Sequence, residues 1–432
     1  MDQRIERISV HRPEELAGAV RLLRSPAAVP KELSRQVEEI IEAVRSGGDA
    51  ALIEYTRRFD WSEASADRLL VDTQELDEAI ASLEPAVYAA LETAIANVAQ
   101  VTAATVGEEG AVRLAQGQRV AVRATPVQSA AIYVPGGRHP YASTVVMGTV
   151  TARAAGVLEV VIATPPGPDG RIDPCVLAAC RMCGATRIYR MGGAQAVAAL
   201  AWGTETVTPV QLIAGPGNVY VQEAKRQLHG VVGTDGFAGP SDLLVLFSSP
   251  AFAPLVALDL LAQAEHGSGT VVVGASPDRQ ALDRLEAELA AQLADQQPPE
   301  GARLYLVELA DVALGIDLAN RFAPEHLELV GEPFEGKASQ VWAAGCLLVG
   351  PYSATAFGDY IAGSNHILPT GGAAAFSSSL SAATFLKRSY EVRIDPAAAA
   401  RLAELAAPLA VREGFPLHAR SMTVRAEGGW EG

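Results

Sequence analysis

The stretch AAIYVPGG (residues 130–137) decides the fold, because a short apolar run ends there in a turn rich in proline and glycine. The segment YASTVVMGTVTARAAG (residues 141–156) follows it with a helical pattern, so the two segments form one strand-then-helix unit. Three further strands of this kind are expected, at EVVIATPPG (159–167), RIYRMGG (187–193) and QLIAGPG (211–217). Four such units within about one hundred residues predict a parallel sheet with covering helices.

A second block of the same kind is expected beyond AGPSD (residues 238–242). Its apolar runs are LLVLF (243–247), TVVVGAS (270–276), RLYLV (303–307) and CLLVG (346–350), and a long charged helix is expected at 277–297. The sequence therefore predicts an α/β protein with two blocks and small terminal appendages.

The flanking segments have helical patterns. Helices are expected at residues 33–46, 49–59 and 74–102, and Gly47-Gly48 closes the first of them. The tail from about residue 387 has the pattern of two helices around PAAAARLAELAAPL (396–409), followed by a final extended segment, HARSMTVRA (418–426).

Glycine-rich turns mark the places where strands meet helices, and ligands in parallel sheets collect beyond the carboxyl ends of the strands. YVPGG, RMGGAQ, AGPGN and AGPSD are therefore expected around one crevice, with backbone and helix N-termini open to a ligand. Gly215-Pro216-Gly217 does not continue as Gly-x-Gly-x-x-Gly, so the usual dinucleotide fingerprint is absent. Walker, His-Glu-x-x-His and Gly-x-Ser-x-Gly motifs are absent too, and motif patterns alone leave the site unassigned.

Composition excludes several classes of function. The formal net charge of −16 over 432 residues argues against nucleic acid or an anionic membrane as the main partner. No apolar run approaches the ~20 residues that span a bilayer, and the N-terminus lacks a signal pattern, so a cytoplasmic location is expected. Cys180 and Cys183 lie in an apolar helical stretch without a second pair, which favours buried thiols over a zinc site.

Two of the seven histidines directly follow a glutamate. Gln263 and His266 are three residues apart on an expected helix and share one face, so both could hold a metal, although a core or capping role stays open. Asp359 and His418 would complete a mixed N/O site suited to zinc, cobalt or manganese, but spacing alone does not bring these residues together.

Glu325-His326 lies in FAPEHLEL (residues 322–329), where Pro324 restricts the backbone and a short strand follows. A histidine beside a carboxylate at a strand edge is a reasonable general base near neutral pH. A structural pair that stabilises the turn is the alternative.

Eight ordered blocks between residues 132 and 421 resemble the histidinol dehydrogenase family. They are IYVPGG, MGGAQAVAALAWGTE, AGPGNVYVQEAKRQ, AGPSDLLV, LLAQAEHG, APEHLEL, GDYIAGSNHILPTGG and LHARS. The resemblance implies oxidation of L-histidinol through L-histidinal to L-histidine with two NAD+, the last steps of histidine biosynthesis.

The resemblance also implies roles for individual residues. Zinc, replaceable by manganese or cobalt, would be held by Gln263, His266, Asp359 and His418. Glu325 and His326 match the catalytic pair, and Tyr133, Gln195 and Asn218 match positions that contact NAD. Ser241 and Glu413 match substrate-contacting positions, and the substrate would also meet His326 and the four metal ligands.

The fold implied by the resemblance has two incomplete Rossmann-like domains and small terminal appendages in an intertwined homodimer. The implied division is residues 1–29, residues 30–132 with 241–385, residues 133–240 on the NAD side, and residues 386–432. Glu413 and His418 would reach the partner subunit's active site.

Three departures from the family pattern stand out. Asp242 replaces the usual glutamate, VTAATVGEEG (residues 101–110) replaces a Phe-His-Glu-x-x-Gln segment, and GGRHPYAS (136–143) replaces a version with small residues. They leave open a paralogue that oxidises another amino- or sulfo-alcohol, such as a sulfopropanediol 3-dehydrogenase. A metal-dependent hydrolase and a catalytically silent metal-binding protein are the alternatives from other classes.

Overall fold

The computed structural model describes residues 5–24, 30–107, 110–136, 139–237, 239–295 and 301–428. It contains two compact units. The larger comprises Met1–Thr105 and Gln128–Phe385, and the smaller comprises Val106–Val127 and Leu386–Gly432.

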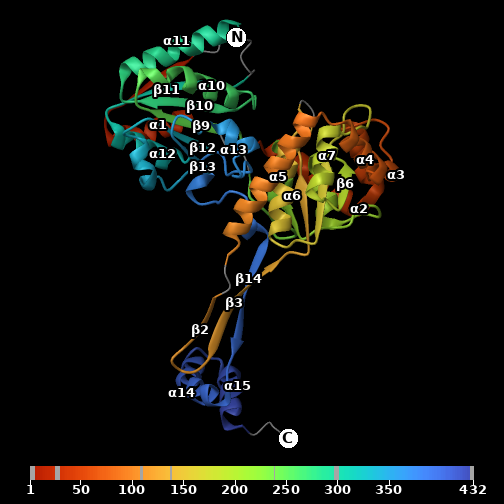
Figure 1. The fold of residues 1–432 in the computed structure, drawn as a ribbon. Helices are drawn as coiled ribbons and strands as arrows, with labels where there is room; N and C mark the ends of the chain where they lie inside the picture. Colours follow the sequence, from red (N-terminus) through yellow and green to blue (C-terminus); the bar gives the residue numbers. More distant parts are fainter. Residues whose placement is uncertain are drawn as a thin grey trace. The chain divides into compact units, whose positions relative to one another are not determined.

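A six-stranded parallel sheet forms the first core of the larger unit (Figure 1). Its order is β1 (Glu6–Val10), β11 (Arg303–Leu309), β10 (Val271–Ser276), β9 (Asp242–Phe247), β12 (His326–Val330) and β13 (Cys346–Val349). One face packs against α10 (Ala253–Ala264) and α11 (Arg279–Asp295). The other packs against α1 (Leu16–Leu23) and α12 (Val312–Phe322). Helices on both faces explain why the strands are almost continuously apolar.

A five-stranded parallel sheet forms the second core. Its order is β6 (Arg187–Arg190), β5 (Glu159–Thr164), β4 (Ser129–Tyr133), β7 (Leu212–Ala214) and β8 (Gly233–Thr234). The connecting helices are α6 (Ala142–Ala154), α7 (Pro174–Cys183), α8 (Gly193–Trp202) and α9 (Val219–Leu228). The predicted strand-then-helix units are thus confirmed, as is the α/β fold with two parallel sheets. Cys180 and Cys183 are buried in α7, as expected.

The N-terminal segments pack differently from the implied domain division. β1 and α1 belong to the core of the six-stranded sheet rather than to an appendage. α2 (Lys31–Phe59) packs on α8 and α9 of the five-stranded sheet, although residues 30–132 were grouped with the other sheet. The apolar face of α2, including Val37, Val44 and Leu52, is buried there. Gly48 has a φ of 55° and bends α2, where the sequence predicted one helix to close and another to begin.

The helix expected at 74–102 is two helices, α4 (Thr73–Ser82) and α5 (Pro85–Thr105). Pro85 begins the second, because a proline lacks the N–H that continuing the first helix would require. Shorter elements are α3 (Ala66–Leu69), α13 (Thr355–Tyr360) and the 3₁₀ turns Pro13–Glu15, Pro250–Phe252, Glu335–Gln340, Ala373–Ala375 and Ala382–Phe385.

Over the described residues no single helix is long and apolar enough to cross a membrane; α4 and α5 reach that length and composition only as a pair bent by 113°.

The smaller unit consists of an antiparallel sheet and two helices. The sheet order is β14 (Leu386–Arg393), β3 (Arg119–Pro126) and β2 (Gly110–Arg113), and the helices are α14 (Pro396–Arg412) and α15 (Pro416–Glu427). The prediction of an extended segment at 418–426 is wrong, since α15 contains it. Pro416 begins this helix and Gly428 ends it in the left-handed conformation, two boundary signals that outweigh the weak local pattern.

Candidate active site

Residues of the predicted site lie at the amino ends of two neighbouring strands. Ser241 directly precedes β9, and Glu325 directly precedes β12. The two strands pair in parallel, with His326 opposite Leu243, so these residues lie side by side. AGPSD was expected beyond the carboxyl end of a strand. In the six-stranded sheet this expectation is wrong, because Ser241 precedes β9 and Asp242 is its first residue.

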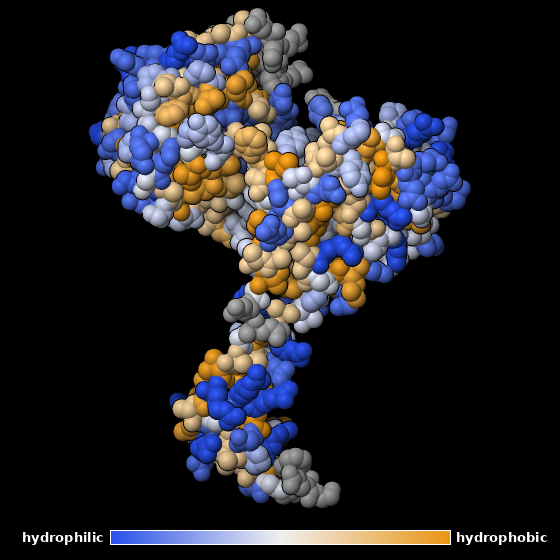
Figure 2. Space-filling view, in the orientation of Figure 1, coloured by the Kyte–Doolittle hydropathy of each residue, from blue (hydrophilic) through white to orange (hydrophobic). Residues whose placement is uncertain are grey.

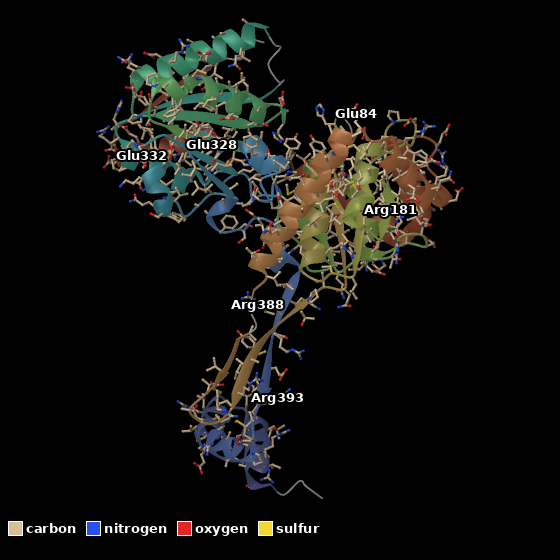
Figure 3. The ribbon with its side chains drawn as sticks, viewed as in Figure 1. Glu84, Arg181, Glu328, Glu332, Arg388 and Arg393 are labelled. Carbon is tan, nitrogen blue, oxygen red and sulfur yellow. The ribbon has the colours of Figure 1, made fainter. Side chains whose placement is uncertain are left out.

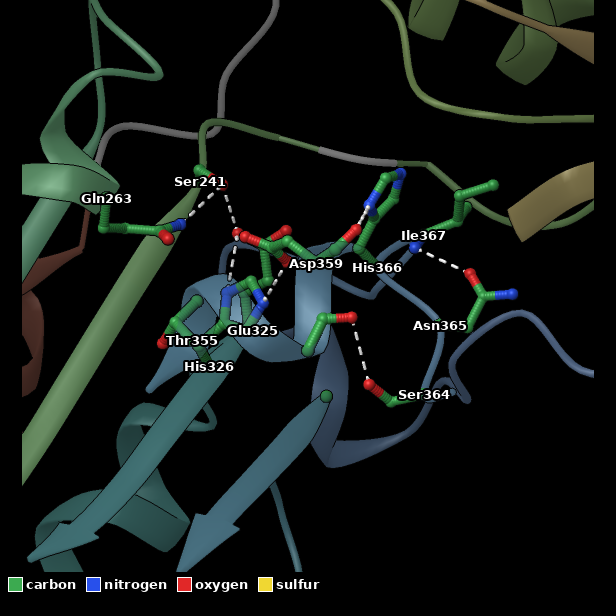
Figure 4. A network of polar contacts seen from close by, with 12 residues as sticks. Ser241, Gln263, Glu325, His326, Thr355, Asp359, Ser364, Asn365, His366 and Ile367 are labelled. Atoms are coloured by element: carbon green, nitrogen blue, oxygen red, sulfur yellow. Dashed lines mark hydrogen bonds and ion pairs between the residues drawn. The ribbon is translucent and has the colours of Figure 1, made fainter. Parts of the chain in front are cut away.

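Glu325 is buried and held by its neighbours across the strands (Figure 4). Its carboxylate accepts hydrogen bonds from the Ser241 hydroxyl and from the backbone N–H of Asp242, the latter at 3.1 Å. In return the backbone N–H of Glu325 donates to the Asp242 carboxylate at 2.7 Å, and Gly371 N–H donates to the same carboxylate at 3.0 Å. Burial and the charge of Glu325 raise the pKa of Asp242 to about 7. The shorter residue at position 242 therefore still closes a network around Glu325.

His326 is 3% exposed and lies between two carboxylates (Figure 4). Its Nε2 is 3.3 Å from Asp359 Oδ1, and its Nδ1 is 3.9 Å from Glu325 Oε2. Burial alone lowers the pKa of His326, but the hydrogen bond to Asp359 and the nearby carboxylates outweigh it and leave the pKa raised. Nδ1 is buried without a hydrogen-bond partner among the described residues, so one ring nitrogen is free for proton transfer.

Gln263 and His266 join the same cluster from the end of α10. Gln263 Nε2 donates to Ser241 Oγ at 3.1 Å, which leaves the amide oxygen to accept or to coordinate. His266 lies one residue beyond the C-cap of α10, in a turn rather than on the helix as predicted. Its Nδ1 is 3.0 Å from the Gln263 carbonyl. A carbonyl only accepts, so Nδ1 carries the proton and Nε2 presents a lone pair.

Asp359 lies on α13, not in the glycine-rich loop that the sequence predicted. Burial raises the pKa of Asp359, but the hydrogen bond to His326 and the charge of that residue lower the pKa further than burial raises it. The carboxylate is therefore ionised near neutral pH, the form that binds a metal.

The donor set of this chain fits a borderline metal such as zinc. Gln263, His266 and Asp359 offer an amide oxygen, an imidazole nitrogen and a carboxylate, which are donor types that zinc accepts in proteins. Within the described ranges, no group of three or more His, Cys, Asp and Glu residues is suited to a metal. A metal site here therefore needs the amide oxygen of Gln263 as one of its ligands. Glu413, the C-cap of α14, and His418 on α15 belong to the smaller unit.

Tyr133 and Gln195 meet at the N-terminus of α8. Tyr133 ends β4, and its hydroxyl accepts a hydrogen bond from Gly193 N–H at 3.0 Å. Gln195 Nε2 donates to Asp60 at 3.3 Å, and Gly192 N–H donates to the same carboxylate at 2.9 Å. Burial raises the pKa of Asp60 to about 6. Sequence reasoning missed Asp60, which lies more than 130 residues from its partners.

Asn218 occupies the next glycine turn, after β7. Its side chain caps α9 by accepting from the backbone N–H of Tyr220 at 3.0 Å and of Val221 at 3.2 Å. Gly215 in this turn has a φ of 112°, and a Cβ there would lie 2.2 Å from the Tyr133 carbonyl oxygen. The turn therefore requires glycine, and it lies between β4 and β7, where the strand order reverses.

His366 links α6 of the five-stranded sheet to Asp359 of the catalytic cluster. Its position in the sequence did not indicate this role. Its Nδ1 is 2.9 Å from the backbone carbonyl of Asp359, and its Nε2 is 3.1 Å from the hydroxyl of Thr144 on α6. Burial lowers the pKa of His366, so the ring is neutral at physiological pH. Nδ1–H then donates to the carbonyl, and Nε2 accepts from the threonine.

Comparisons with known proteins identify the family of this chain. A family model described as histidinol dehydrogenase matches residues 23–426. A histidinol dehydrogenase from a Synechococcus strain is 42% identical over 408 residues, 93% of each chain. One from Pseudomonas syringae pv. syringae is 39% identical over 429 residues, 98% of this chain and 95% of the relative. The crystal structure of histidinol dehydrogenase from Elizabethkingia anophelis has a TM-score of 0.91 and 28% identity over 99% of both chains. The chain therefore belongs to the histidinol dehydrogenase family.

Proposed function

We propose that this chain oxidises L-histidinol through L-histidinal to L-histidine, using two NAD+ and one zinc ion per subunit. Membership of the family makes it an oxidoreductase that acts on a CH–OH group. The observation that carries the finer proposal is the cluster at the amino ends of β9 and β12. There a buried histidine with one free ring nitrogen lies beside Glu325 and Asp359, and Gln263 is linked to Glu325 through Ser241.

His326 would take the proton of the substrate hydroxyl. Asp359 holds Nε2 of the ring, which orients Nδ1 as the acceptor and stabilises the imidazolium that results. Gln263, His266 and Asp359 would hold the zinc, which when bound orients the amine and imidazole nitrogens of histidinol. NAD+ bound near Tyr133, Gln195 and Asn218 supplies the hydride acceptor.

Glu325 would activate water for the second oxidation, in which the aldehyde becomes the acid. Ser241 and Asp242 N–H hold its carboxylate in place, so the acceptor oxygen is oriented before the water arrives. Keeping the aldehyde bound between the two steps explains why one site serves both.

A second copy of the chain would complete each site with Glu413 and His418. The smaller unit exposes large apolar side chains, including Leu405, Leu409 and Leu417, which are 60–80% exposed on the isolated chain. Figure 2 shows hydrophobic side chains on the surface of this unit. Exposed apolar surface of this kind supports an interface between copies, and so a homodimer with shared sites. We propose a cytoplasmic location for this dimer.

A substrate panel tests the proposal. Purified protein is given NAD+ with histidinol, histidinal, or small diols and sulfonates that lack imidazole, and NADH is measured per substrate consumed. Two NADH per histidinol are expected, with activity lost on chelation and restored by zinc. Turnover of a sulfopropanediol alone would establish the paralogue, and hydrolysis of an amide or ester without NAD binding would establish the hydrolase.

A further inference from the structure

Glu328 is a buried carboxyl group that lies directly beneath the active site. It is 2% exposed and lies on β12, two residues after His326, so both side chains extend from the same face of the strand. Figure 3 shows Glu328 within the six-stranded sheet. The proposed reaction does not use it.

One oxygen of Glu328 holds the first turn of α13. Glu328 Oε1 accepts from the backbone N–H of Thr355 at 2.9 Å and from the Thr355 hydroxyl at 2.7 Å. Thr355 begins α13, where backbone N–H groups have no partner within the helix. Asp359 lies four residues further along, one turn from the Glu328 contact, so the position of its carboxylate depends on this anchor.

The Glu328 side chain is also hydrogen-bonded to Asp259 of α10. Asp259 lies four residues before Gln263, one turn away on the same helix. Glu328 therefore connects the strand that carries His326 to the helices that carry Gln263 and Asp359.

A hydrogen bond between two carboxyl groups requires a proton, because an ionised carboxylate has no donor. Thr355 supplies two donors to Oε1 of Glu328, so the proton lies in the contact between Glu328 and Asp259. Burial, followed by the charge of Asp259, raises the pKa of Glu328 to about 8, whereas burial raises that of Asp259 only to about 6. Burial thus keeps one proton in the contact between these two carboxyl groups near neutral pH.

We propose that Glu328, through its contacts with Thr355 and the proton it shares with Asp259, is a positioning residue that holds α10 and α13 against β12 and so sets Gln263 and Asp359 for metal binding. This inference rests on the proposed function, because it assigns those two residues to the metal.

Zinc affinity of the metal-free protein tests the inference, measured by competition with a chromophoric chelator. Glu328→Gln reproduces the neutral acid, since its amide oxygen accepts from Thr355 and its NH₂ donates to Asp259; affinity close to wild type is expected. Glu328→Leu has a similar volume but leaves both partners unpaired. We expect it to bind zinc about 10–100-fold more weakly, the usual effect of losing a group that orients metal ligands.

Two further measurements keep the inference testable if Glu328→Leu does not fold. Thr355→Val removes the hydroxyl donor and keeps both the volume and the backbone N–H, so zinc binding about five-fold weaker is expected. Infrared difference spectra of metal-free wild type against Glu328→Gln at pH 7 should show a protonated carboxyl band that the variant lacks.

The inference is overturned if Glu328→Gln binds zinc as weakly as the leucine variant, if both leucine and valine variants bind like wild type, or if wild type lacks the carboxyl band. None of these measurements involves substrate. A protein that binds zinc as expected but does not oxidise histidinol would refute the proposed function and leave the role of Glu328 supported.

Discussion

The two parallel sheets have the same strand order but carry their candidate residues at opposite ends. Apart from β1, which flanks β11 in the six-stranded sheet, the strands of each sheet lie third, second, first, fourth and fifth in chain order, as β6-β5-β4-β7-β8 and as β11-β10-β9-β12-β13. Tyr133 ends β4 and Asn218 lies in the turn after β7, so both are at the carboxyl edge, the usual place for a ligand. Ser241 and Glu325 precede the amino ends of β9 and β12. A repeated topology therefore does not determine which edge of a sheet carries the chemistry.

The largest effect is expected at the amino edge of the six-stranded sheet. His326→Asn should lower kcat about 10²–10⁴-fold, because it removes the general base, while leaving the zinc content near that of wild type. Rapid-mixing measurement of the first NADH formed, together with metal analysis, checks this. His266→Asn is the matched control and should lose zinc. Equal loss of metal in both variants would show that the two histidines do not have separate roles.

An intermediate effect is expected at the carboxyl edge of the five-stranded sheet. Gly215→Ala puts a Cβ at 2.2 Å from the Tyr133 carbonyl oxygen and should weaken NAD+ binding about 10-fold or more, with zinc affinity unchanged. Calorimetric titration with NAD+ measures it.

Gly230→Ala provides the control for that substitution. Gly230 has a similar φ of 103°, but a Cβ there meets nothing within 4 Å. The Gly230→Ala variant should therefore have the same backbone strain but keep its NAD+ affinity. If both variants lost NAD+ affinity equally, backbone strain would explain the effect, and the carboxyl edge of the five-stranded sheet would lose this support as the NAD+ site.

The smallest effect concerns Asp60 and is seen as a pH dependence of stability. Its folded pKa of about 6 lies above the ordinary value of 3.8, so the folded state binds a proton more readily than the unfolded state. Stability should therefore fall as pH rises from about 4 to 6, by at most about 3 kcal/mol. Asp60→Asn should flatten this slope in urea unfolding followed by fluorescence. An unchanged slope would mean that other groups cause it.

The sequence was sufficient for features that depend on local pattern. The strands of the five-stranded sheet were predicted because each apolar run ends at a glycine turn, as at Gly192 and Gly215. His266 and Asp359 were named as site residues by resemblance, and their local structure differs from the prediction, since a helix end or a short helix depends on contacts with other elements. The segment containing His418 was predicted as extended because its pattern is weak, with helix boundaries that only Pro416 and Gly428 signal.

Contacts distant in sequence were beyond prediction. Asp60 meets Gly192, and Glu328 meets Asp259, through folding of the whole chain rather than through any spacing. The sequence HLELV does not reveal that its glutamate is buried, because the same alternation of apolar and polar residues is typical of a strand with one face in solvent.

His366 has a mechanical consequence for the proposed reaction, which would use NAD+ twice. A neutral imidazole with one donor and one acceptor nitrogen is a rigid, directional spacer, and here it joins Thr144 on α6 to the backbone of Asp359. A movement of α6 during the proposed exchange of NADH for NAD+ would therefore be transmitted to α13, which carries Asp359. We expect this link to hold Asp359 in place between the two proposed oxidations.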